Sequence, residues 1–142
     1  MTSVDSPLGG RLPSQESLFR AAAQLEEAIE EPSATPAWYQ TVHAAIRSCV
    51  LAIEYHLDSL LGPEGIGHEV REREPRLLPD LERLEAQLAR ALIDAWEAKA
   101  TAPAVAPAFI DRLRALIVEV RAAAGHEFDL VHETFRPTPG ED

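Results

Sequence analysis

The longest amphipathic pattern in the chain constrains its fold most. Between residues 39 and 60, apolar side chains recur every three or four positions, which places them on one stripe of an α-helix. They are Tyr39, Val42, Ile46, Cys49, Ile53, Leu57 and Leu60. Thr35-Pro36 provides a capping residue followed by a proline that suits the first helical position, and Gly62-Pro63 ends the pattern. The pattern therefore predicts a helix over residues 36–61, long enough to cross a small domain.

Three further segments have the same helical periodicity, at residues 14–31, 77–95 and 109–130. A shorter helical turn is expected within residues 67–74, because the connection that follows the long helix is unusually long for a helix-to-helix loop. No segment alternates apolar and polar residues as a strand does. The four amphipathic helices therefore predict an all-α fold, an antiparallel up-down-up-down four-helix bundle.

A chain of 142 residues is expected to form one domain, because this length buries a single core without disulfides or a structural metal. We assign residues 14–135 to the bundle, residues 1–13 to a flexible leader and residues 136–142 to a short tail. The leader lacks the basic and apolar regions of a secretory signal, and no apolar run is long enough to cross a bilayer. The only cysteine, Cys49, cannot form an intramolecular disulfide. We therefore expect a cytoplasmic protein.

The chain is acidic, with 24 Asp and Glu residues against 13 Lys and Arg residues and a formal net charge of −11. Nucleic-acid binding depends on clustered Lys and Arg that neutralise phosphates, so we expect no nucleic-acid partner, and we expect no membrane partner either. The sequence has no Gly-rich phosphate loop, no Cys-x-x-Cys pair and no Gly-x-Ser-x-Gly elbow. We therefore expect that the protein is not an enzyme. We expect it to form a homodimer or to bind another protein.

Histidines and carboxylates are the remaining residues that could carry chemistry, because such groups on facing helices of a bundle can bind a metal. Glu127 interrupts the apolar stripe of the last helix. A carboxylate at such a position bends out to solvent, pairs with a cation or binds a metal, because burying it unpaired is costly. His56 lies at the shoulder of the long stripe, where packing or a hydrogen bond also accounts for a histidine.

Several landmarks follow one another in the middle of the chain. They are His56-x-x-x-Leu60-Leu61-Gly62-Pro63-Glu64-Gly65-Ile66-Gly67-His68-Glu69-Val70, then Glu74-Pro75-Arg76-Leu77 and Leu81-Glu82-Arg83-Leu84. This order resembles small bacterial members of the hemerythrin-like (HHE cation-binding) bundles, and the ending Leu130-Val131-His132-Glu133-Thr134-Phe135 is similar as well. The resemblance covers about residues 38–142. It implies a four-helix bundle that binds iron.

The resemblance also implies a set of iron ligands, of which this chain keeps a part. Such proteins hold iron with a His-x-x-x-Glu on the second helix, a Glu-His pair on the third and a His-x-x-x-Glu on the fourth. His56 matches the first histidine and Glu127 the last glutamate. The other ligand positions hold Leu60, Gln87-Leu88 and Ala123. His126, next to Glu127, is a third candidate ligand if the helix is rotated.

Two hypotheses follow. Because Leu60, Leu88 and Ala123 lie on apolar stripes, we expect a hemerythrin-like bundle with a degenerate metal site and no cofactor, which acts as a binding or regulatory module. The alternative is an iron-binding sensor or storage protein for oxygen, nitric oxide or iron. It would retain a reduced site at His56, Glu127 and His126. The two hypotheses differ in whether these three side chains converge in the fold.

Overall fold

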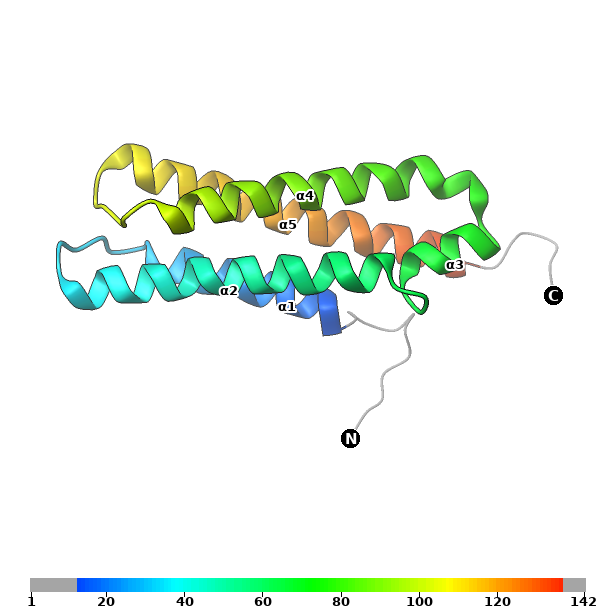
Figure 1. Ribbon diagram of the computed structural model, residues 1–142, viewed down its shortest axis with the longest axis horizontal. Helices are drawn as coiled ribbons and strands as arrows, with labels where there is room; N and C mark the ends of the chain where they lie inside the picture. Colours follow the sequence, from blue (N-terminus) through cyan, green and yellow to red (C-terminus); the bar gives the residue numbers. More distant parts are fainter. Residues whose placement is uncertain (1–12, 137–142) are drawn as a thin grey trace, which may run out of the picture.

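The computed structural model describes residues 13–136, so the expected leader before Pro13 and the expected tail after Arg136 lie outside the described residues. All regular structure within this range is helical, which confirms the expected all-α class. Four long helices lie side by side, and a short helix packs at one end of the molecule (Figure 1). The elements are α1 (Pro13–Ala28), α2 (Pro36–Leu61), α3 (Ile66–Arg73), the 3-10 turn η1 (Pro75–Leu77), α4 (Leu78–Ala100) and α5 (Pro107–Phe135).

Helix α2 has the bounds that the sequence predicts, and its two caps explain them. The backbone N–H of Trp38 donates a hydrogen bond of 3.2 Å to Oγ1 of Thr35. Pro36 lies in the first turn, where its missing N–H is not needed. At the other end, the backbone N–H of Gly62 bonds to the carbonyl of Ser59 at 3.4 Å. The short helix expected within residues 67–74 is also confirmed, as α3.

Helix α1 ends at Ala28, before the boundary at residue 31 that the sequence pattern predicts. The indole Nε1 of Trp38 donates a hydrogen bond of 2.9 Å to the carbonyl oxygen of Ala28. This contact satisfies a carbonyl at the end of α1 with a side chain from α2. The predicted boundary was wrong because it was placed directly before Pro32. A pattern within one segment of the sequence cannot include a hydrogen bond from the side chain of another helix.

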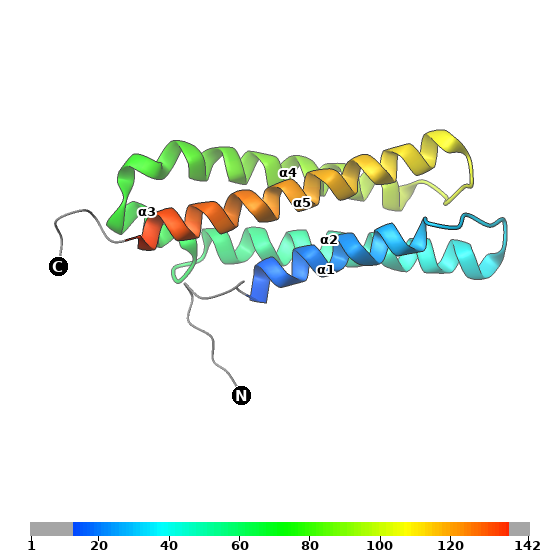
Figure 2. The ribbon, with the colours of Figure 1, turned by 180° about the vertical axis from the view of Figure 1, so that it is seen from behind.

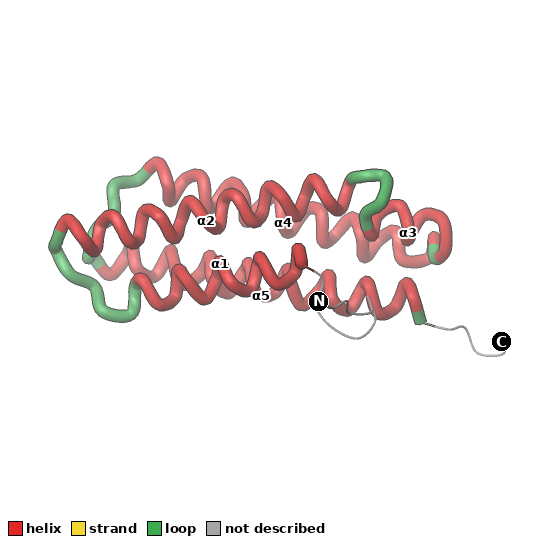
Figure 3. Tube along the Cα trace, turned by 90° about the horizontal axis from the view of Figure 1, so that it is seen from below, coloured by secondary structure: helices red, strands yellow, loops and turns green. Residues whose placement is uncertain are grey.

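The long helices form a ring in which α1 contacts α2, α2 contacts α4, α4 contacts α5, and α5 contacts α1. Figure 3 shows α2 and α4 in one layer, with α1 and α5 in the other. Helices α2 and α5 are therefore related by a diagonal of the ring. The loops after α1 and after α4 lie at one end of the molecule, and α3 lies at the opposite end (Figures 1 and 2).

The core between these helices is almost entirely apolar. Within residues 16–136, the buried polar or charged side chains are His56, Glu127 and Thr134. Thr134 donates a hydrogen bond of 2.7 Å to the carbonyl of Leu130 in its own helix, so His56 and Glu127 are the two that require a partner from elsewhere in the fold. None of the helices in residues 13–136 combines the length and the apolar character that crossing a membrane requires.

Candidate functional site

Two of the three candidate ligands meet in the centre of the bundle. Nε2 of His56, on α2, contacts Oε1 of Glu127, on α5, as an ion pair. The two side chains are 0% and 5% exposed. Because α2 and α5 are related by the diagonal of the ring, the contact crosses the core instead of lying along the seam between two neighbouring helices.

Helical periodicity places both side chains in this core. His56 lies one turn before Leu60 on α2, and Glu127 lies one turn after Ala123 on α5. Leu60 and Ala123 are buried, and so is Leu88 of α4. Three of the positions that the family resemblance assigns to additional ligands are therefore filled by apolar side chains within the core, and the fourth holds Gln87, which contacts His126.

Burial determines the electrostatics of the pair. It raises the pKa of Glu127 from an ordinary value of 4.5 to about 8, because the carboxylate loses its hydration in the apolar core. At neutral pH the carboxyl group of Glu127 is therefore largely protonated, and it lies in contact with the imidazole of His56. Of the three outcomes expected for Glu127, bending out to solvent is excluded by its burial, and its contact is with His56, which is a cation only when the imidazole is protonated.

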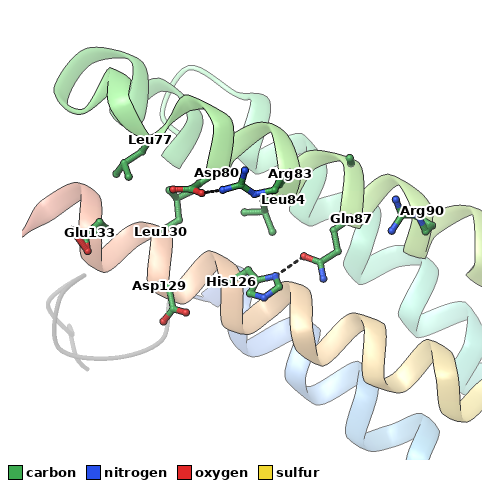
Figure 4. Close-up of a pocket in the computed structure, with 11 residues that line it drawn as sticks. Leu77, Asp80, Arg83, Leu84, Gln87, Arg90, His126, Asp129, Leu130 and Glu133 are labelled. Carbon is green, nitrogen blue, oxygen red and sulfur yellow. Dashed lines mark hydrogen bonds and ion pairs between the residues drawn. The ribbon is translucent and has the colours of Figure 1, made fainter.

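His126, the third candidate ligand, does not join this pair. Consecutive residues of a helix are turned by about 100° from each other, so Glu127 faces the core while His126 is exposed. Nδ1 of His126 lies 2.8 Å from Oε1 of Gln87 on α4 (Figure 4). In residues 13–136 no group of three or more His, Cys, Asp or Glu side chains is arranged to hold a metal ion.

A groove of about 690 Å³ lies between α4 and α5 around the Gln87–His126 contact (Figure 4). Its apolar part consists of three leucines and an alanine, and three of its charged residues take part in ion pairs within the protein. Asp80 pairs with Arg83, and Glu133 pairs with residues 76 and 136. The apolar lining residues are Leu77, Leu84, Ala86 and Leu130. The sequence pattern does not predict this groove. The spacing of residues along each helix does not define which side chains of the two helices meet.

A second acidic group with a shifted pKa lies further along the same seam. Burial, and then a hydrogen bond with Asp94, raise the pKa of Glu119 to about 7, while the nearby Arg90 opposes the shift. The protonated carboxyl group of Glu119 donates a hydrogen bond to Asp94, whereas its ionised form would be repelled by that carboxylate. This contact joins α5 to α4, as does the ion pair of 3.0 Å between Arg112 and Glu97.

The donor set at the centre of the bundle does not fit a di-iron site. Such a site needs several nitrogen and oxygen donors, and His56 and Glu127 supply two. Leucine and alanine cannot coordinate a metal, and His126 is directed to Gln87. The geometry fits a buried contact between a carboxyl group and an imidazole better than a metal centre.

Comparison with known proteins does not assign a family or a function to this site. No protein-family model, no curated protein and no solved structure matches the chain. The resemblance to hemerythrin-like bundles therefore rests on the sequence landmarks alone.

Proposed function

We propose that the chain is a hemerythrin-like bundle of antiparallel up-down-up-down topology, in which packing has replaced the metal site. In this proposal it acts as a binding or regulatory module and not as an enzyme. The observation that supports the proposal best is the composition of the core. His56 and Glu127 contact each other there, and Leu60, Leu88 and Ala123 are buried where ligands would be required.

The contacts between helices support the topology. Along α4 the residue number rises from Gln87 to Glu97, while along α5 the number of the contacted residue falls from His126 to Arg112. Neighbouring helices that pair in this way run in opposite directions. The positions of the loops at alternate ends of the molecule agree with this (Figure 1).

The position of the central pair also favours binding over catalysis. A general acid or base must come within hydrogen-bond distance of its substrate. His56 and Glu127 are enclosed by the core and have no access to a substrate. The exposed His126 lies in the α4–α5 groove, where Asp80 and Glu133 are already engaged in ion pairs. A surface that binds another protein therefore suits this molecule better than an active site.

Iron content tests the proposal. Protein expressed with added iron and purified without chelators should contain far less than one iron per chain, and it should lack the absorption band of an oxo-bridged pair. About two irons per chain, the stoichiometry of a di-iron bundle, together with that band would overturn the proposal.

A second candidate function is an iron-binding sensor or storage protein for oxygen, nitric oxide or iron, with a reduced metal site. The convergence of His56 and Glu127 across the core favours it, whereas His126, the third ligand expected from the sequence, is directed to Gln87, so the site would consist of His56 and Glu127. If it is correct, replacing both residues with Ala removes the bound metal, whereas the matched variant His126→Ala, at an exposed position, retains it. A metal content that is the same in all three proteins argues against this candidate.

A further inference from the structure

We propose that a second copy of this chain docks on the outer face of α2 and the adjoining face of α1. In the proposed dimer the two α2 helices lie antiparallel, about a two-fold axis close to Leu51. The inference goes beyond the proposed function, because this surface lies away from the central pair and its use does not depend on metal content.

Three large apolar side chains on α2 remain exposed in the folded chain, and two of them, Leu51 and Tyr55, share one face; the third, Leu61, lies at the end of the helix. Leu51 is 56% exposed and Tyr55 is 55% exposed. They are four residues apart, so they lie next to each other on the outward face of the helix. Adjacent exposed apolar side chains on a helix face, in contrast to scattered ones, are typical of interaction surfaces.

A hollow of about 280 Å³ lies beside these two side chains, between α1 and α2. Its lining includes the small residues Ala21 of α1 and Ser48 and Ala52 of α2. The same face therefore carries both protruding and recessed parts. A two-fold interface requires this combination, because one patch must be complementary to its own copy.

In an antiparallel pairing, the spacing of residues along α2 brings the protruding side chains of one copy opposite the recessed residues of the other copy. An axis between residues 51 and 52 places Leu51 opposite Ala52 of the second copy. The same axis places Tyr55 opposite Ser48 of the second copy, where the hollow can receive the ring. By symmetry each contact occurs twice.

Two opposite charges strengthen this register. Arg47 and Asp58 are exposed on α2 and lie about three turns apart, on the same flank of the outward face. Within residues 13–136 neither side chain takes part in an ion pair. The proposed axis brings Arg47 to within about 3 Å, measured along the helix, of the level of Asp58 of the second copy. The dimer would thus gain two equivalent ion pairs.

The area of the face is sufficient for a dimer. Helix α2 has 26 residues and α1 has 16, which correspond to lengths of about 39 and 24 Å. If each helix presents a strip about 10 Å wide, the two copies bury roughly 1,200 Å² in total. This is the lower limit for specific interfaces, so we expect a dissociation constant in the micromolar range, about 1–100 µM.

Sedimentation velocity of the full chain at concentrations from about 1 µM to 1 mM covers this range. The parent should pass from monomer to dimer, and Leu51→Glu and Tyr55→Glu should each weaken the dimer at least about tenfold, because they place a charge in the apolar contact. Val118→Glu is the matched control, since Val118 is 67% exposed on α5, and it should leave the dimer unchanged. Equal helical circular dichroism establishes that all variants are folded.

A charge exchange tests the register. Arg47→Asp and Asp58→Arg should each weaken the dimer several-fold, and the double variant should recover most of the loss. A parent that stays monomeric over the whole range overturns the proposal and leaves this face to residues 1–12 or to another protein. A dimer that Tyr55→Glu leaves intact, or that Val118→Glu weakens equally, also overturns it.

Discussion

The contact between His56 and Glu127 holds two ionisable groups in an apolar core. Each group alone would be buried without compensation, which is unfavourable by several kcal/mol, about 3–5 kcal/mol when one partner of such a pair is removed. Together they form a buried contact in which each polar group faces the other. The pair also restricts the rotation of α2 and α5, because a turn of either helix separates the two side chains.

Double-mutant analysis should therefore show strong coupling between these two residues. His56→Leu and Glu127→Leu should each lower the free energy of unfolding by about 3–5 kcal/mol, because each leaves the other group buried without its partner. The double variant should lose much less than the sum, because it replaces the pair with apolar side chains of similar size. Urea unfolding at constant pH measures the three values, and additive losses would show that the contact is not coupled.

The raised pKa of Glu127 leads to a pH dependence with a defined sign. The folded chain keeps the proton up to about pH 8, whereas Glu127 in the unfolded chain loses it near pH 4.5. Between these values Glu127 is more protonated in the folded state than in the unfolded state, so its contribution to the free energy of unfolding falls as the pH rises, by about 1.4 kcal/mol per pH unit at most. The contribution is fully present below pH 4.5 and is lost by about pH 8.

Glu127→Gln isolates this effect, since Gln does not titrate and can donate a hydrogen bond to His56. The unfolding free energy of the parent minus that of the variant should decrease across the window from pH 4.5 to 8 and be constant on either side. Chemical unfolding at several pH values measures it. A difference that rises with pH, or that does not change, would contradict a carboxyl group protonated by burial.

At the level of the helices, the junction between α2 and α3 depends on two glycines for a steric reason. The φ angle of Gly65 is −85°, which any residue adopts. A Cβ atom at this position would, however, collide with the backbone oxygen of Ser59, and one at Gly67 would lie 2.5 Å from the backbone oxygen of Leu60. Helix α3 begins directly against the last carbonyl groups of α2, so no space remains for a side chain.

Alanine at either position should therefore destabilise the fold. Gly65→Ala and Gly67→Ala are each expected to lower the free energy of unfolding by about 1–3 kcal/mol, because backbone must move to relieve the contact. Gly125→Ala is the matched control: nothing lies within 4 Å of the added methyl group, and alanine favours a helix interior, so stability should rise by about 0.5–1 kcal/mol. Thermal and urea unfolding compare the three, and a neutral Gly65→Ala would contradict the close approach of α3 to α2.

At the scale of the whole molecule, a metal site in this bundle would require donors from three helices at once. In the proposed alignment with hemerythrin-like bundles, the additional donor positions hold Leu60 on α2, Gln87-Leu88 on α4 and Ala123 on α5. Because these residues lie in separate helices, no single substitution completes a donor set around the central pair.

Restoring the donors together tests the proposed relationship to hemerythrin-like bundles. The chain with Leu60→Glu, Gln87→Glu, Leu88→His and Ala123→His should bind iron that the parent does not, because His56 and Glu127 would then be joined by four more donors. Elemental analysis measures the iron, and the same variant with His56→Ala is the control that should bind less. A helical variant without iron would contradict the proposed alignment of the ligand positions.

Local sequence patterns were sufficient to predict the helices. Periodicity and capping are set by residues close in the chain, so the bounds of α2 and the position of α3 were predicted correctly. The end of α1 was not predicted correctly, because the hydrogen bond from Trp38 to Ala28 joins residues of different helices. The same local patterns placed Glu127 on the core stripe of α5, and its burial confirms this.

The partners of the candidate residues could not be read from those patterns. Adjacent in the chain, His126 and Glu127 face different surroundings: Glu127 meets His56 across the diagonal, and His126 meets Gln87 in the α4–α5 groove. Spacing along one helix defines which residues share a face. Which face meets which depends on the rotation and register of all the helices together, and these are established only when the helices pack around a common core.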